Sequence, residues 1–552
     1  MTGNRSKRPM ASASINDHPY AESDMTETYD IVVMGSGQNT LGAAAYLAKA
    51  GKKVAVLERN DVIGGGAVTL ERDAPGFKYD KHSVVHAMAQ ANPMILNDEL
   101  GLLSQFGLQY FRPPAMATTV LDDYRTLHHL LDLDAMCDQI AQFSLKDAET
   151  YREFVVWGMR ILPMVVAGMF TVPLPMSVFL GILEQSEDGR RVIDYMLRSP
   201  LQIVNELFES DLLKIHLLRL TSEGFPQFPD DMGTGIAMLM TPAFAHKYGV
   251  GMPIGGSGML ATALARCIEH HGGDVITNCE VARVLTSGGR ATGVETTDGR
   301  QFVARDAVVA SIHPHHLDRF VDGIEPDVLA RAKRTLPAPF SLVKIDAALD
   351  RPLNRKGPDG TEGTDGFGEF VSANTLTEYL QSYDPLRHGR TSLDNPLLSG
   401  GAMAMPGRQP EGKALLYVLS FQPYNLADGG PQKWDSIKEQ VADRLIERLD
   451  HFIPGVKDNI LQRTVDSPLD MTRWSPNSML YGDAGGLGSQ FFHLSGYRPT
   501  PELSQYAVPG VDRLYLCGPF MHPGGGVFGI GRPTAIRICD DLGINFDKVV
   551  AQ

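Results

Sequence analysis

The feature that most constrains the fold of this 552-residue chain is a compact pattern near its N-terminus. Residues 29–34 (YDIVVM) form an apolar run that ends at Gly35, which predicts a buried parallel strand. Residues 41–50 are rich in alanine and leucine and stop at a glycine, so we expect a helix there. A second predicted strand, at 53–57, is followed by Glu58. Strand, glycine turn, helix, strand and acid together are typical of a dinucleotide-binding βαβ unit.

The turn after the first strand supplies the first set of predicted cofactor ligands. Glycines at its first and third positions let the backbone approach a pyrophosphate, and the following helix offers its N-terminal amides to that anion. In the usual motif a third glycine permits close packing of the helix on the strand, and this chain has a threonine, Thr40, at that position. Glu58 is expected to accept hydrogen bonds from a ribose. The ligands predicted in this part are Gly35, Ser36, Gly37, Gln38, Asn39, Thr40, Glu58 and Arg59.

Two further glycine-rich segments fit the same cofactor. In the first, GGGAVT at 64–69, successive glycines let the chain pass a bulky dinucleotide without an intruding side chain. The second, at 518–531, follows a predicted strand at 513–516 and supplies backbone amides that can stabilise negative charge on the reactive part of the cofactor. The predicted ligands are Gly64, Gly65, Gly66 and Ala67 from the first segment, and Gly518, Pro519, Gly526 and Val527 from the second.

Composition and charge exclude several other classes of protein. A net charge of −15 without any basic run argues against binding to nucleic acid. The five cysteines are scattered and never spaced as CxxC, so neither a disulfide framework nor a zinc site is predicted, and no other metal-ligand spacing occurs. This favours a reducing compartment, the cytoplasm. Residues 1–27 are polar and are predicted to be a disordered tail.

One uncharged segment, at 161–183, has roughly the length of a bilayer-spanning helix. Pro163, Pro173 and Pro175 would break a simple spanning helix. The favoured interpretation is a helix–turn–helix that lines an apolar pocket. Peripheral contact with a membrane and true spanning stay as alternatives.

The three glycine motifs, in this order and at these places, resemble the phytoene desaturase-like flavoproteins, within the wider glutathione reductase/amine oxidase type of FAD fold. The resemblance includes GMPIGGSG at 251–258 and extends from about residue 29 to about 545. It implies one non-covalently bound FAD, with Val281 binding the adenine through its backbone. It also implies a lipophilic, unsaturated substrate of isoprenoid, terpene or carotenoid type. Members of this family include desaturases, saturases and isomerases, so the direction of the reaction stays open.

Three rival functions stay open at this point. A flavin amine oxidase has the same cofactor fold, a nicotinamide-only dehydrogenase would lack flavin, and a non-catalytic scaffold would bind FAD without being reduced. The sequence does not predict the oligomeric state.

The predicted fold class is α/β: a discontinuous FAD-binding domain of the glutathione reductase/amine oxidase type, plus a substrate domain with a second sheet and a helical cap. The FAD-binding parts are predicted at 28–94, 246–315 and 501–552, and the substrate parts at 95–245 and 316–500. Outside the first unit, helices are predicted at 94–103 and 434–452, and separate strands at 301–303 and 307–310.

One departure from the family pattern concerns His82. The family usually has a small residue beside the isoalloxazine ring where this chain has His82, in the stretch YDKHS at 79–83. A histidine there is a candidate catalytic base that would titrate near neutral pH; the alternative is a packing residue. His313 and His522 are further candidates to line the site, whereas the pairs His128–His129 and His270–His271 are expected to be solvated.

Overall fold

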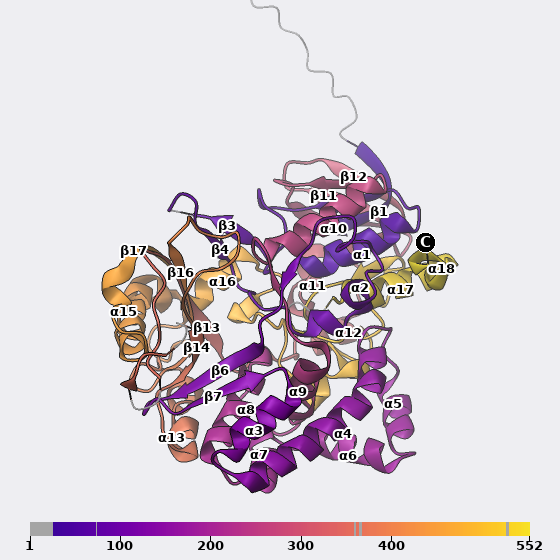
Figure 1. Ribbon diagram of the computed structural model, residues 1–552. Helices are drawn as coiled ribbons and strands as arrows, with labels where there is room; N and C mark the ends of the chain where they lie inside the picture. The colour runs from indigo at the N-terminus through magenta and orange to yellow at the C-terminus, as the bar shows by residue number, and fades with distance from the viewer. Residues whose placement is uncertain (1–25, 73, 358–359, 364–366, 526–528, 552) are drawn as a thin grey trace, which may run out of the picture.

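The computed structural model describes residues 26–72, 74–357, 360–363, 367–525 and 529–551. Two seven-stranded sheets and a group of helices make up this part of the chain (Figure 1). This arrangement agrees with the predicted α/β class, including the second sheet and the helical cap. Residues 1–25 of the predicted tail lie outside the described residues, and the first strand begins at Thr26, inside the range predicted as tail.

The first sheet has the order β10-β11-β12-β1-β2-β9, with β18 paired to β12. Its bounds are β1 Thr26–Met34, β2 Val54–Leu57, β9 Asp274–Ile276, β10 Val281–Ser287, β11 Arg290–Thr296, β12 Gln301–Ala310 and β18 Leu514–Leu516. Strands β9, β2, β1, β12 and β18 are parallel, and their last residues lie in one row across the sheet. Chain segments far apart in the sequence therefore meet at one sheet edge.

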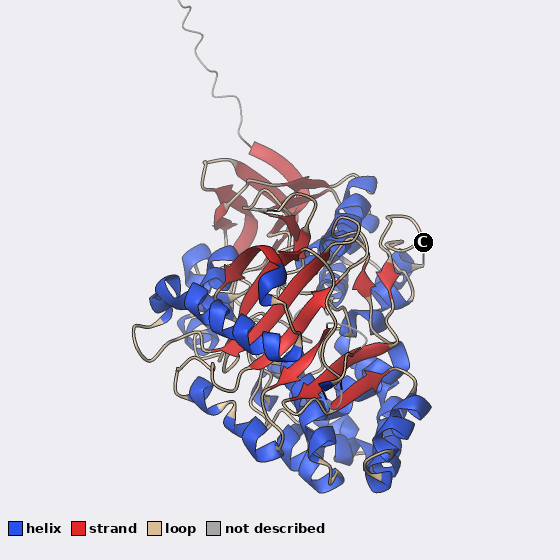
Figure 2. Cartoon of the chain, turned by 60° about the vertical axis from the view of Figure 1, so that its left-hand side comes forward, coloured by secondary structure: helices blue, strands red, loops and turns tan. Residues whose placement is uncertain are grey.

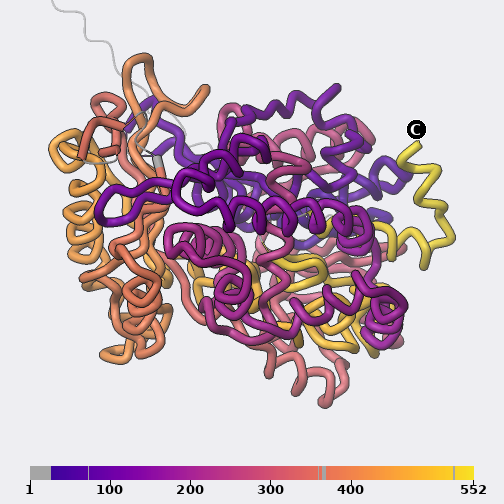
Figure 3. The backbone as a smooth tube through the Cα atoms, turned by 60° about the horizontal axis from the view of Figure 1, so that its bottom comes forward, coloured from indigo at the N-terminus to yellow at the C-terminus, as the bar shows by residue number. Residues whose placement is uncertain are grey.

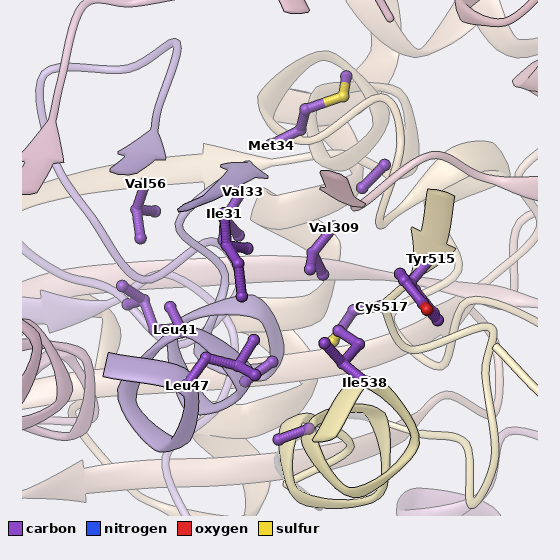
Figure 4. Packing of buried hydrophobic residues seen from close by; sticks show 14 of the residues in the cluster. Ile31, Val33, Met34, Leu41, Leu47, Val56, Val309, Tyr515, Cys517 and Ile538 are labelled. Atoms are coloured by element: carbon purple, nitrogen blue, oxygen red, sulfur yellow. The ribbon is translucent and has the colours of Figure 1, made fainter. Parts of the chain in front are cut away.

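Helices α1 (Gln38–Lys49), α10 (Gly258–His270) and α17 (Gly531–Leu542) pack against this sheet. Figure 4 shows Ile31 and Val33 of β1 lying beside Leu41 and Leu47 of α1, with Ile538 of α17 next to Cys517. The yellow C-terminal chain returns beside the indigo N-terminal unit (Figure 3). Burial of these side chains on both faces explains why the strands form continuous apolar runs in the sequence.

Two predicted elements differ from the structure. The strands predicted at 301–303 and 307–310 are one strand, β12, because its first half pairs with both β1 and β11. The helix predicted at 94–103 is wrong: α2 covers only Pro93–Leu96. Asp98 takes a left-handed backbone conformation (φ 50°), and its carboxylate accepts the amide protons of Leu103 and Ser104, which replaces the helical hydrogen bonds.

The second sheet has the order β17-β13-β16-β15-β14-β6-β7 and crosses the centre of Figure 2. Its bounds are β6 Ala115–Leu121, β7 Thr126–Leu130, β13 Ser341–Leu349, β14 Phe367–Val371, β15 Leu397–Met403, β16 Ala414–Gln422 and β17 Ile460–Asp466. A single parallel pair, β14–β6, joins the two distant parts of the sequence. Helix α15 spans Trp434–Phe452, the range that the sequence predicts, and packs its apolar side on this sheet.

Seven helices form the cap: α3 Leu133–Ala141, α4 Leu145–Met169, α5 Met176–Leu183, α6 Glu187–Leu197, α7 Pro200–Leu207, α8 Asp211–Gly224 and α9 Ile236–Tyr248. The uncharged segment is thus a helix–turn–helix, and none of the described helices is long and apolar enough to cross a membrane. Pro163 lies inside α4 without ending it. Lys247 donates to the carbonyl of Met159, the group that proline leaves without its helical partner.

His129 was expected to be solvated, but it is fully buried. Along β7 alternate residues point inward, so His129 faces the cap, where its Nδ1 lies 3.0 Å from Nε2 of His216. The remaining elements are the hairpin β3 Thr69–Glu71 and β4 Lys78–Asp80, the pair β5 Tyr110–Phe111 and β8 Met252–Pro253, and the helices α11 Leu317–Phe320, α12 Pro326–Ala332, α13 Leu376–Gln381, α14 Asp384–Arg387, α16 Pro468–Trp474 and α18 Phe546–Val550.

Candidate cofactor site and active site

The predicted dinucleotide turn lies at the carboxyl ends of the parallel strands. Met34, Ala310 and Leu516 are register partners across β1, β12 and β18, so Gly35, Ser311 and Cys517 follow at the same edge. Helix α1 begins just after Gly37, with no side chain capping it and no acid in its first turn. The positive end of its dipole therefore favours an anion at this turn.

Glu58 stands beside this turn, as predicted for a ribose ligand. Its Oε2 accepts hydrogen bonds from the amide (2.9 Å) and the hydroxyl (2.7 Å) of Ser36, and its Oε1 accepts from the amide of Asn60 (2.9 Å). These bonds fix the carboxylate in place. Because a carboxylate offers about four lone-pair sites and three are used by the chain, it keeps capacity for one ribose hydroxyl.

The second glycine segment packs directly on the first. The Gly64 amide donates to the carbonyl of Ser36 (2.9 Å), and a Cβ on Gly65 would lie 3.1 Å from Cα of Gly37. A Cβ on Gly66 would overlap Met479. The backbone therefore makes a cradle that side chains would fill, as a bulky dinucleotide requires.

The C-terminal segment closes the cradle from the other side. Gly518 and Pro519 lie in a turn in which the Met521 amide donates to the Gly518 carbonyl (2.9 Å), and the Ile530 amide donates to Oδ1 of Asn39 (3.2 Å). Gly526 and Val527 lie outside the described residues.

Gly531 provides the close backbone packing on α1 for which the usual motif has a third glycine. A Cβ on Gly531 would overlap the carbonyl oxygen of Asn39 on α1. Thr40 instead donates its hydroxyl to the carbonyls of Gly35 (2.6 Å) and Gly37 (3.0 Å), which braces the turn.

Three other predicted ligands lie around the turn. Gln38 is buried in the first turn of α1, and Arg59 is exposed, with its guanidinium donating to the Arg473 carbonyl. Val281 begins β10, two residues after Cys279, whose amide donates to the Glu58 carbonyl (2.7 Å). Val281 thus lies on the same side as the predicted ribose ligand.

His82 lies where the cradle meets the second sheet. It is buried, Cδ2 of its ring lies 3.9 Å from a Cβ built on Gly66, and its backbone carbonyl accepts a hydrogen bond from Tyr417 of β16. Neither ring nitrogen has a hydrogen-bond partner within the described residues. Burial, together with the charge on Lys81, lowers the pKa of His82 to about 3, so the imidazole is neutral.

A buried ion pair fixes the chain just before His82. Nζ of Lys81 lies 2.7 Å from a carboxylate oxygen of Asp466 on β17, and Arg72 lies 3.4 Å from the other oxygen. Burial alone would raise the pKa of Asp466, but Lys81 and Arg72 lower it to about 2. The carboxylate therefore stays charged and ties the segment to the second sheet.

An apolar cavity of about 490 Å³ lies between the cap and the C-terminal glycine segment. Its walls include Met164, Phe179, Ile182, Met196 and Met240 of the cap, and residues 522–525. The predicted pocket lined by the uncharged segment is therefore present. Arg498 is the single charged residue among the described residues that line it.

Arg498 is a functional candidate that the sequence analysis missed. Its guanidinium is buried and donates to backbone carbonyls only: Gly485, Leu487, Gly488, His493, Pro519 and Met521. Burial lowers its pKa to about 10, against the effect of Asp483. Arg498 lies in a loop region, where no sequence pattern indicates a side chain that donates to six carbonyls between five and 23 residues away.

Replacing Glu58 is expected to weaken cofactor retention. Loss of charge-assisted hydrogen bonds, worth about 1.5–3 kcal/mol, predicts a 10- to 150-fold higher Kd for FAD in Glu58→Ala, with a smaller effect in Glu58→Gln. The exposed Glu149→Ala provides the control. Kd is measured by titrating apoprotein with FAD and following fluorescence. A native Kd in Glu58→Ala would show that Glu58 is not the ribose ligand.

The chain shows clear similarity to known flavoproteins. Residues 41–530 match the family model described as flavin containing amine oxidoreductase. Three relatives are a mouse pyridine nucleotide-disulfide oxidoreductase domain-containing protein 2 (29% identical; 93% of this chain, 94% of the relative), a limonene dehydrogenase polypeptide of Castellaniella defragrans (26%; 95% and 97%) and a lycopene-forming phytoene desaturase of Pseudescherichia vulneris (24%; 93% and 99%).

A solved structure of cyclohexylamine oxidase from Brevibacterium oxydans has the same fold, with a TM-score of 0.56 at 15% identity over 93% of this chain and 99% of that one. The glycine cradle, the uncapped helix and Glu58 fit the FAD that this family binds. The chain belongs to the flavin containing amine oxidoreductase family and is a phytoene desaturase-like, FAD-dependent oxidoreductase.

Proposed function

We propose that this oxidoreductase desaturates, saturates or isomerises an unsaturated lipophile of isoprenoid, terpene or carotenoid type, by hydride transfer to or from flavin N5. The observation that carries the proposal is the apolar cavity, which reaches residues 522–525 of the C-terminal glycine segment. Its volume falls within the range of about 300–1,000 Å³ that is usual for small-molecule sites. The names of two relatives, a limonene dehydrogenase and a phytoene desaturase, support this substrate class.

The charge of the cavity counts against the alternative, an amine substrate. An ammonium group loses its hydration on burial and needs an anionic or aromatic partner. The described lining residues include no aspartate or glutamate, and their one charge, Arg498, is positive. Their aromatic side chains, Phe179 and Phe225, supply no anionic group for an ammonium.

The chain's own residues bind and orient the substrate, and they exclude water from it. The bound flavin supplies the two-electron acceptor or donor. The cap holds the lipophile away from solvent. Arg498 donates to the Pro519 carbonyl and lies next to Gly524, so its electric field favours negative charge near residues 519–524. We propose His82 as the neutral group that accepts the accompanying proton.

Anaerobic mixing with a substrate panel tests this function. We expect flavin absorbance to bleach with at least one terpenoid or carotenoid precursor, and to stay unchanged with putrescine or cyclohexylamine. Photoreduction of the same sample is the control for a competent flavin. Bleaching by an amine would contradict the proposal. A flavin that photoreduces but responds to no compound would favour the non-catalytic scaffold.

Substitution of His82 tests its proposed role. A general base typically contributes about 10²–10⁴ in rate, and a weakly basic imidazole is expected at the lower end. Both His82→Gln and His82→Ala should therefore slow single-turnover flavin reduction roughly 10²-fold. Because the ring is neutral well above its pKa of about 3, His82 should add no inflection between about pH 5 and 9. A native rate in His82→Gln would reduce His82 to a packing residue.

We also propose that the mouth of the cavity touches a membrane surface. Met164, Leu174 and Ile182 line the cavity and are about half exposed, and Val178 is exposed beside them on α5. Apolar side chains at the entrance of a lipophile site fit a lipid surface, from which such a substrate would enter.

Flotation with phosphatidylcholine–phosphatidylglycerol liposomes tests this contact. Burial of a side chain such as Ile182 contributes about 1.5–3 kcal/mol, so Ile182→Glu should reduce binding roughly tenfold or more. Leu461→Glu, which changes an exposed leucine on β17, is the matched control and should float like the native protein. Absence of flotation in the native protein would leave the segment as an internal pocket wall alone.

A further inference from the structure

Three polar side chains that line the apolar cavity, Gln227, His493 and His522, have hydrogen-bonding atoms without a partner in the described part of the chain. Gln227 lies on the loop between α8 and α9 and is fully buried. Neither its amide nitrogen nor its amide oxygen has a partner in the described part of the chain, although it lines the cavity. Because an unpaired buried amide is costly, its retention points to a partner from outside the chain.

The second is His522, in the C-terminal glycine segment that forms part of the wall. Its Nε2 lies 2.9 Å from the carbonyl oxygen of Gly168, and a carbonyl only accepts hydrogen bonds, so this nitrogen carries the proton. Burial lowers the pKa of His522 to about 4, which keeps the ring neutral. Nδ1 is therefore a bare acceptor, and no partner for it exists among the described residues.

These atoms define the ligand chemistry that fits. His522 needs a donor, and Gln227 offers both a donor and an acceptor. The Nε2 of His493 accepts from the Leu336 amide, so its unpartnered Nδ1 offers a further donor. A hydrocarbon satisfies none of these side chains. A carboxylate has no proton to give to Nδ1 of His522, and an ammonium group meets no acid in the described wall. A hydroxyl group donates and accepts, and carries no charge.

We propose that the lipophile bound in this cavity carries a hydroxyl group, for which Gln227 and His522 supply the hydrogen-bond partners. The proposal rests on the function proposed above and narrows its substrate class from unsaturated lipophiles in general to those that carry a hydroxyl group. Gln227 is then a specificity-determining residue.

Matched ligands that share one carbon skeleton test the proposal on the FAD-loaded protein. The probes are farnesol, farnesyl methyl ether and farnesene, with binding followed by the change in flavin absorbance. Native protein should bind farnesol roughly tenfold or more tightly than farnesene, since hydrogen bonds to otherwise unpaired buried groups are gained. The ether, which accepts but cannot donate, should fall between them.

Gln227→Met removes the amide and keeps the volume. It should weaken farnesol binding until the alcohol and the hydrocarbon bind within about threefold of each other. Its Tm should equal or exceed the native value, because the amide has no partner to lose in the described chain; a purely structural glutamine would lower Tm. Gln381→Met, an exposed glutamine at the end of α13, should change neither quantity.

Three results would overturn the proposal, and they differ from one another. Equal affinities of the native protein for farnesol and farnesene mean that the cavity does not recognise a hydroxyl group. An unchanged preference in Gln227→Met means that water or another group satisfies the amide. If none of the three lipophiles binds, this inference fails, and the proposed function fails with it only if no compound of the substrate panel bleaches the flavin.

Discussion

Close contact between backbones at one sheet edge is the constraint on which the rest of this structure depends. The parallel strands that end at Met34, Ala310 and Leu516 bring distant chain segments together. Glycines at 37, 65 and 531 let the backbones that follow come into contact. A side chain at Gly65 or Gly531 would fill the space between neighbouring backbones. The cofactor cradle therefore exists only when the C-terminal segment has returned to the N-terminal unit.

A second constraint sets the position of the chain where the cradle meets the second sheet. The stretch that carries His82 is held to the second sheet by the ion pair of Lys81 with Asp466 and by the hydroxyl of Tyr417. A buried ion pair contributes little net stability, because desolvation offsets the Coulomb attraction. Removing one partner alone leaves an unpaired buried charge, so the pair fixes the geometry more than it adds to the free energy of unfolding.

The sequence predicted what local patterns determine. The unit from β1 to Glu58 and helix α15 follow from apolar runs, glycine turns and helical periodicity. Features that depend on distant partners were not predictable. Pro163 is tolerated because Lys247 replaces its missing hydrogen bond, and His129 is buried because the cap covers β7. Nothing adjacent to Gln227 or Arg498 in the sequence indicates a cavity.

Arg498 places a charge in the wall of an apolar cavity without offering that charge a hydrogen bond to the ligand. Six carbonyls take all the N–H groups of the guanidinium, so it has no donor left for a carboxylate. Its charge acts only through its field, which is strong where water is excluded. That field disfavours a cationic ligand in the cavity and favours negative charge along the neighbouring glycine segment. The proposed selection against amines and the proposed support for hydride transfer therefore both rest on this one buried side chain.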